Sequence, residues 1–181
     1  MALPHTGEKT RDLSLVALMA ALIALCAWLT LPIGPVPFTM QTFAIFAALG
    51  LLGGKRGSLA VGVYLLLGLV GLPVFSGFGA GPGTLLGATG GYLLGFLLLA
   101  LTYWLLTARL GTSLPLMVLS MIAGLVVCYA FGTAWYVLGY TGGGTATLLS
   151  TLSLCVFPYL LPDALKLVLA LLLVRRLRPH L

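Results

Sequence analysis

Charged residues are scarce in this sequence. Of its 181 residues only 7% are charged, while 61% are hydrophobic and the mean hydropathy is +1.18. Soluble domains carry about 25% charged residues, so the composition excludes a soluble protein and predicts an integral membrane protein. The net charge is +6, but the cations follow the loops between apolar runs instead of forming one basic patch. No nucleic-acid partner is therefore expected.

Cysteine and histidine are also few. Cys26, Cys128 and Cys155 stand singly inside apolar runs, and His5 and His180 lie near the two ends of the chain. Isolated cysteines in such runs usually behave as small buried apolar residues. We therefore expect no disulfide, no metal site and no histidine catalysis.

Nucleotide-binding motifs are missing as well. The run Gly53-Gly-Lys-Arg-Gly57 lacks the earlier glycine and the following Ser or Thr of a phosphate-binding loop, because Leu49 and Arg56 occupy those positions. The glycine-rich run 77–83 has no strand–helix unit around it. We predict that the chain is not an enzyme and has no cofactor. Any ATPase that drives it would be another polypeptide.

Long apolar runs are what the sequence does contain. A membrane-spanning helix needs about 20 apolar residues. Six runs qualify, at roughly 13–31, 38–54, 57–76, 84–107, 114–139 and 158–176. The apolar segment 145–157 is shorter and is expected to form a short helix or a re-entrant piece that caps the bundle, and not a seventh span. The prediction is a single all-α domain, residues 1–181, built as a six-transmembrane-helix bundle.

The positions of lysine and arginine predict the orientation. With six spans, eight of the nine cations lie on one side, namely Lys9, Arg11, Lys55, Arg56, Arg109, Arg175, Arg176 and Arg178. By the positive-inside rule both termini are expected to be cytoplasmic. The loops 32–37, 72–83 and 140–147 then face outward. They are uncharged and rich in Gly and Pro, which favours a lid or a binding vestibule.

Asp163 and Lys166 are the only charged residues between Arg109 and Arg175. A charge in the bilayer costs about 2.5–3.5 kcal/mol on insertion scales, so membrane proteins seldom retain one without a function. Three residues apart on a helix, the two side chains share one face. Asp163 supplies acceptors and Lys166 supplies donors. We predict a polar clamp, in the outer half of the bundle, that captures a small polar molecule.

The first predicted span carries a row of alanines. Ala17, Ala20, Ala21 and Ala24 form two small-xxx-small pairs, and Ala27 continues the row. Such pairs let another helix approach closely in lipid. Two partners remain open at this point: a helix of the same chain, or a second membrane protein.

Several segments resemble the signatures of one known family. They are Pro35-Val-Pro-Phe-Thr-Met-Gln-Thr42, Gly68–Phe75 with Gly83–Phe96, and Pro162-Asp-Ala-Leu-Lys166. In this order they resemble the BioY family, the biotin-binding S components of energy-coupling-factor (ECF) transporters. The resemblance covers nearly the whole chain. Ala88 departs from it, since a proline is expected there, but this change removes no ligand group.

The resemblance implies a substrate-specific subunit in the plasma (inner) membrane of a prokaryote. Such a subunit captures biotin from the outer face and delivers it inward. It also implies docking, through the alanines of the first helix, on a transmembrane coupling subunit driven by two ATPase subunits. Some family members are thought to act without that module.

The resemblance also suggests roles for residues of the binding site. Asp163 would accept from the ureido N–H groups of biotin, and Lys166 would donate to its carbonyl or carboxylate. Thr39 and Gln41 would complete the polar contacts, with capping of the second helix as their alternative role. The aromatic residues Phe75, Tyr92 and Tyr136 would pack on the ring and tail, with plain bundle packing as the alternative.

Two other functions remain open from the sequence. One is an ion-coupled carrier of another small vitamin with Asp163 as its titrating site, although no internal repeat supports it. The other is a membrane scaffold in which the Asp163–Lys166 pair only fixes helix register.

Overall fold

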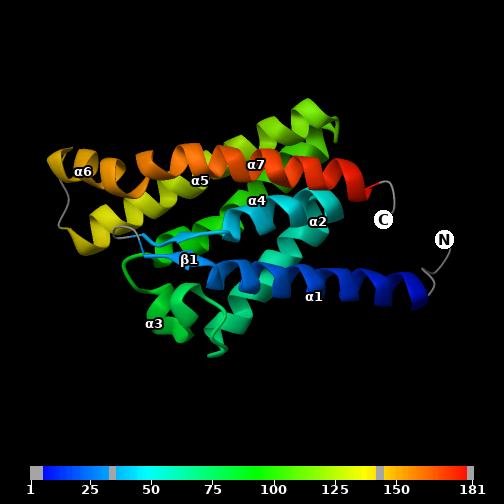
Figure 1. Cartoon of the computed structure of the whole chain (residues 1–181), viewed down its shortest axis with the longest axis horizontal. Helices are drawn as coiled ribbons and strands as arrows, with labels where there is room; N and C mark the ends of the chain where they lie inside the picture. Colours follow the sequence, from blue (N-terminus) through cyan, green and yellow to red (C-terminus); the bar gives the residue numbers. More distant parts are fainter. Residues whose placement is uncertain (1–5, 33–35, 142–144, 179–181) are drawn as a thin grey trace.

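The computed structural model describes residues 6–32, 36–141 and 145–178, and most of them are helical (Figure 1). The long helices are α1 (Thr6–Trp28), α2 (Gln41–Leu69), α4 (Gly90–Leu110), α5 (Leu114–Tyr140) and α7 (Phe157–Leu177). The short elements are β1 (Thr30–Leu31), β2 (Phe38–Thr39), η1 (Ser76–Phe78), α3 (Gly81–Leu85) and α6 (Thr145–Cys155). Residues 33–35 and 142–144 of the predicted outward loops lie outside the described residues.

Helix α2 is bent at Gly53. This residue has φ 77° and ψ 172°, which is not helical and which glycine adopts without steric cost. The bend divides α2 into segments 41–52 and 54–69, which run in different directions in Figure 1. The two segments fall where the sequence predicts separate spans at 38–54 and 57–76. Lys55 and Arg56 follow the bend directly.

Two predicted spans extend six or seven residues beyond the observed helices at one end. The span predicted at 57–76 is too long, because α2 ends at Leu69 and Gly71 turns the chain with φ 108°. The span predicted at 84–107 begins too early, because α3 and a turn precede Gly90. In both cases apolar residues continue through the turn, so hydropathy alone does not show that the helix is interrupted.

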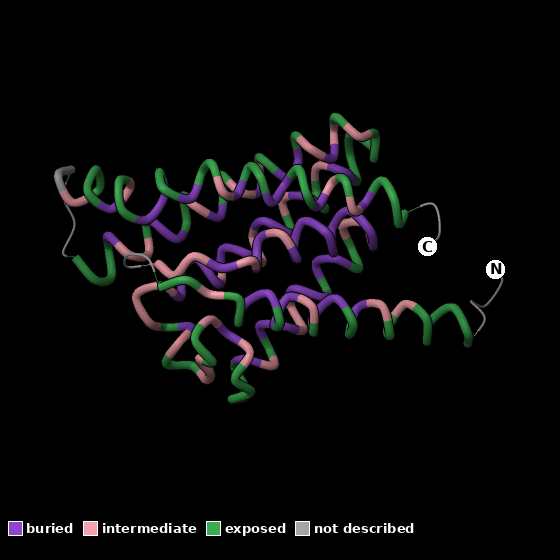
Figure 2. Tube along the Cα trace, in the orientation of Figure 1, coloured by how far each residue is buried: buried purple, intermediate pink, exposed green. Residues whose placement is uncertain are grey.

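The first segment of α2 lies at the centre of the bundle (Figure 2). Residues 44–52 are all buried, and a helix that is apolar on every side is expected in such a place. The outer helices instead expose large apolar side chains, such as Leu18, Leu138 and Leu161 at 60%, 78% and 73%. A continuous apolar exterior of this kind suits lipid and not water.

The described residues contain five helical stretches that are long and apolar enough to cross a membrane. In this count the bent α2 is one stretch, and α6 with α7 is another. The chain is therefore a multi-pass α-helical membrane protein. The predicted burial of Cys26, Cys128 and Cys155 is confirmed, and all three are free thiols.

A short β-ribbon joins α1 to α2. In it Thr30 pairs with Thr39 and Leu31 pairs with Phe38, antiparallel. The ribbon lies far from the end of the molecule where α1 begins and α7 ends (Figure 1). The ribbon places Phe38 and Thr39 just before the start of α2. There Phe38 lies next to the first turn of α7, where its ring stacks on Tyr159.

Candidate functional site

Two prolines precede the charged pair on α7. Pro158 lies in the first turn, where a missing N–H is not needed. Pro162 lies inside the helix and removes the N–H that would bond to the carbonyl of Pro158. Asp163 follows at once, and its side chain and that of Lys166 turn into the bundle, where the residues are 3% and 4% exposed.

The two charges are paired directly. The Lys166 Nζ lies 2.7 Å from the Asp163 Oδ1. On the other side, the Nζ lies 4.1 Å from the centre of the Phe38 ring, a distance typical of a cation–π contact. Phe38 itself stacks on Tyr159, with 6.4 Å between the ring centres. The ammonium group is therefore held between a carboxylate and an aromatic face.

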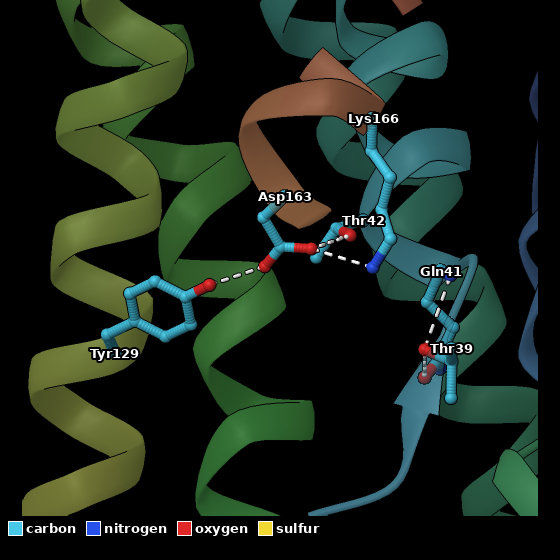
Figure 3. Close-up of polar contacts among 6 residues, drawn as sticks. All are labelled: Thr39, Gln41, Thr42, Tyr129, Asp163 and Lys166. Carbon is cyan, nitrogen blue, oxygen red and sulfur yellow. Dashed lines mark hydrogen bonds and ion pairs between the residues drawn. The ribbon is translucent and has the colours of Figure 1, made fainter. Parts of the chain in front are cut away.

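Asp163 accepts two further hydrogen bonds from other helices (Figure 3). The Thr42 hydroxyl, from α2, donates to Oδ1 at 2.8 Å. The Tyr129 hydroxyl, from α5, donates to Oδ2 at 2.5 Å. One carboxylate thus ties α2, α5 and α7 together. Three donors therefore satisfy the buried carboxylate.

Thr39 and Gln41 form a second polar group beside the first. The Thr39 hydroxyl donates to the Gln41 Oε1 at 2.9 Å and accepts from the backbone N–H of Gln41 at 3.3 Å. The Gln41 Nε2 in turn donates to the Tyr64 hydroxyl at 2.5 Å. Thr39 therefore satisfies one free N–H group at the start of α2, while the side chain of Gln41 is held toward the bundle interior.

Two neighbouring cavities lie against these polar groups. One, of about 50 Å³, is lined by the charged pair together with Thr42, Tyr129 and Cys128. The other, of about 100 Å³, is lined by Gln41, Phe75, Thr84, Thr89 and Leu93. They share five lining residues, which are Val36, Pro37, Thr39, Tyr92 and Phe96. Polar groups thus meet apolar walls, as in small-molecule sites.

The sequence matches the BioY family over residues 3–181. This chain belongs to the BioY family. Among curated relatives, "Biotin transporter BioY" of Thermotoga maritima is 41% identical over 93% of this chain and 96% of its own length. "Probable biotin transporter BioY" of Pyrococcus horikoshii is 36% identical over 94% and 98%. The expectation of a BioY protein is confirmed.

A solved structure agrees with the assignment to the BioY family. It is a crystal structure at 2.1 Å of the S-component for biotin from an ECF-type ABC transporter. The TM-score is 0.84 with 30% identity, over 98% of this chain and 95% of that one. The shared architecture therefore extends over the whole bundle and is not limited to the motif segments.

The predicted aromatic residues do not all reach the cavities of this BioY chain. Tyr92 lines both cavities and Phe75 lines the second. Tyr136 lines neither, and instead stacks on Tyr140 with 6.4 Å between the ring centres. The nearby hollow on α5, about 490 Å³, is open to the surface and mostly apolar. Its polar side chains, Trp135 and Tyr140, already donate to the backbone carbonyls of Gly87 and Leu86.

Sequence reasoning missed four residues that contact the predicted site residues: Thr42, Tyr129, Tyr64 and Phe38. Thr42 and Phe38 lie within the signature segment from Pro35 to Thr42. Thr42 directly follows Gln41 and Phe38 directly precedes Thr39, so their positions beside predicted site residues could have indicated them. Tyr129 and Tyr64 lie in apolar runs, where a tyrosine is usually interpreted as a residue that only packs in the core. Their role depends on which helix faces them.

Replacing Tyr129 with Phe tests the second donor to Asp163. The variant keeps the ring and removes the hydroxyl from Oδ2. We expect the free energy of unfolding to fall by about 1–2 kcal/mol, the size of a strong hydrogen bond between membrane helices. Detergent-induced unfolding in mixed micelles measures it. Tyr136→Phe on the same helix is the control, because its hydroxyl has no hydrogen-bond partner among the described residues. Equal effects in the two variants would contradict the assignment.

Proposed function

We propose that this chain is the substrate-specific membrane subunit that captures biotin at the outer face and delivers it inward. The observation that carries the proposal is the buried Asp163–Lys166 pair beside the two cavities. The BioY membership and the printed names of the relatives support biotin as the substrate. Biotin combines a ureido ring, which has two N–H donors and a carbonyl, with an apolar ring and a carboxylate tail.

The hydrogen-bonding capacity of the pair suits this ligand. Lys166 has three N–H donors, and Asp163 takes one of them. Asp163 has about four acceptor positions, of which Thr42, Lys166 and Tyr129 fill three. The pair therefore retains two donors and one acceptor for a ureido N–H and a carbonyl or carboxylate. Gln41 and Thr39 add polar groups on the neighbouring wall, and Phe75 and Tyr92 supply apolar surface.

The segment 36–39 must move for biotin to be enclosed. Sites for such ligands usually measure about 300–1,000 Å³, whereas the two cavities are about 50 and 100 Å³. Val36, Pro37 and Thr39 line both cavities. Displacement of this segment would join them into one site, under the Gly- and Pro-rich loops predicted to face outward.

Six membrane crossings with cytoplasmic termini fit the arrangement best. α1 begins and α7 ends at the same end of the molecule (Figure 1), which requires an even number of crossings. Counting the two segments of α2 on either side of Gly53 as separate crossings gives six. Lys55 and Arg56 at the bend then lie on the same side as the termini, in agreement with the positive-inside rule. The membrane is proposed to be the plasma (inner) membrane of a prokaryote.

Wild-type binding is the direct test of the function. Titration calorimetry of biotin into the purified chain in detergent is expected to show tight one-to-one binding. Thiamin and riboflavin, titrated in parallel, are expected to give no heat of binding. Absence of biotin binding by a chain that elutes as a single folded species would overturn the assignment. Binding of another vitamin of the panel would redirect it.

We further propose that α1 docks on a transmembrane coupling subunit, which two ATPase subunits drive. The alanine row divides between two faces. Ala20 and Ala24 are buried, at 1% and 7% exposure, so they allow close packing within the chain, where α1 lies against α2. Ala17 and Ala21 are exposed and form the pair that a partner helix can approach.

The double variant Ala17→Leu/Ala21→Leu tests this docking face. We expect biotin binding by the purified chain to stay within about twofold of wild type, because neither residue lines the cavities. Assembly with the coupling subunit, measured by co-purification from cells, is expected to fall at least tenfold, since two added side chains block close approach. Ala134→Leu, at an exposed position of α5, is the control. Undiminished co-purification of the double variant would contradict the proposal.

A further inference from the structure

A groove of about 350 Å³ lies between the second segment of α2 and α4, away from the substrate site. Its walls are apolar, with Leu66 from α2 and Leu97, Leu101 and Trp104 from α4. One end carries Lys55. A Cβ added at Gly62 would meet no atom within 4 Å, so the groove is open at its floor.

Ser58 is an unexplained polar residue in this groove. The residue is only 6% exposed, and its hydroxyl is the one buried side-chain polar atom without a hydrogen-bond partner among the described residues. A buried hydroxyl that lacks a partner is unfavourable, and native structures seldom retain one. Ser58 lines the groove, and its hydroxyl oxygen is itself almost fully covered. Rotation of this short side chain about χ1 would turn the hydroxyl toward a molecule seated there, which could then supply the missing hydrogen bond.

The charge at the end of the groove is also unpartnered. Arg56 forms an ion pair with Asp12, with 2.7 Å between Nη1 and Oδ1. The adjacent Lys55 has no ion pair within the described part of the chain and is exposed. The cation therefore remains available to an anion at the membrane surface.

The order of these groups along the helix matches one class of molecule. Lys55, Ser58, Gly62 and Leu66 are spaced by three and four residues, so they share one face of the segment. At 1.5 Å per residue, Ser58 lies about 4.5 Å, Gly62 about 10 Å and Leu66 about 16 Å beyond Lys55. Along this face a cation comes first, a hydroxyl second and an apolar trough third. The groups that would face them in a phospholipid, namely the phosphate, the glycerol ester and the acyl chain, follow one another in the same order.

We propose that this groove binds an anionic phospholipid. Its phosphate pairs with Lys55, an ester or glycerol oxygen accepts from Ser58, and one acyl chain lies over Gly62 against Leu97 and Leu101. Trp104, at the rim, is a residue type enriched at the membrane interface. A transmembrane helix of a second copy of this chain is the other occupant that Ser58 and Gly62 would admit. Lipid is favoured because its phosphate supplies an anion at the place where Lys55 lies.

Native mass spectrometry of the chain tests the proposal. The chain is purified and reconstituted with equal amounts of phosphatidylglycerol and phosphatidylcholine. Wild type is expected to retain one phosphatidylglycerol in preference. Gly62→Leu, which fills the trough, is expected to lose it, and Lys55→Gln is expected to reduce the preference about fivefold, the effect of one lysine near an anionic surface. Ser58→Ala should weaken retention with no change in the preference between headgroups.

Arg176→Gln is the control for charge, because Arg176 is exposed at the end of α7 and lines none of the grooves described above. Melting temperatures and elution profiles confirm that each variant is folded. Equal retention of phosphatidylglycerol by wild type and Gly62→Leu would overturn the proposal. So would an equal loss of preference in Lys55→Gln and Arg176→Gln. Self-association that is seen in wild type and lost in Gly62→Leu, with lipid retention unchanged, would assign the groove to a helix of a second copy.

Discussion

Asp163→Asn is expected to abolish measurable biotin binding and to lower the free energy of unfolding by about 3–5 kcal/mol. The substitution removes the negative charge and leaves the Lys166 ammonium buried without its partner, which is the costly way to break an internal ion pair. The amide also replaces one carboxylate oxygen, an acceptor, with an NH2 group, a donor. In wild type the Thr42 and Tyr129 hydroxyls donate to the two oxygens of Asp163, so one of them would lose its acceptor. Calorimetry measures the binding, and unfolding in mixed micelles measures the stability.

A double variant separates the two effects. Asp163→Asn/Lys166→Met removes both charges, so most of the lost stability is expected to return. Binding is expected to stay absent, because the donors and the acceptor for the ligand are both gone. If the pair only fixed the register of the helices, the restabilised double variant would bind biotin as wild type does. Wild-type affinity in Asp163→Asn would show that the pair does not hold the ligand.

Phe75→Ala is expected to lower the free energy of unfolding by about 3–5 kcal/mol. The side chain is fully buried and meets Tyr64 edge-on, with 5.5 Å between the ring centres. Its ring also fills the space at Gly68, where an added Cβ would come within 2.0 Å of Cζ. Truncation leaves a cavity between α2 and the loop that follows it, and this is the usual cost of deleting a buried phenyl group.

The same substitution is expected to weaken biotin binding at least tenfold. Phe75 lines the second cavity and supports Tyr64, which accepts the hydrogen bond of Gln41. Phe78→Ala, three residues later, is the matched control, because Phe78 is 64% exposed and lines neither cavity. Unfolding and calorimetry are run on both variants. If both variants lost a similar, small amount of biotin affinity, Phe75 would have a packing role only and no part in the site.

Local sequence patterns were sufficient for most of the helices and for the charged pair of the candidate site. Spacing alone places Asp163 and Lys166 on one helical face, and the structure pairs them across 2.7 Å. The charge pattern around Lys55 and Arg56 marks a turn near the bend observed at Gly53. The predicted spans extend furthest beyond the observed helices where apolar residues continue through turns, at Gly71 and before Gly90.

The sequence by itself determined the class of protein, the apolar spans and the charged pair, because these follow from composition and from spacings of a few residues. The tertiary structure decided what surrounds the pair. Thr42 lies 121 residues and Tyr129 lies 34 residues from Asp163 in the chain, so only the packing of α2, α5 and α7 brings their hydroxyls to it. The same packing buries Ala20 and Ala24 while exposing Ala17 and Ala21. Helical periodicity places residues on a face, but only the neighbouring helices determine what that face contacts.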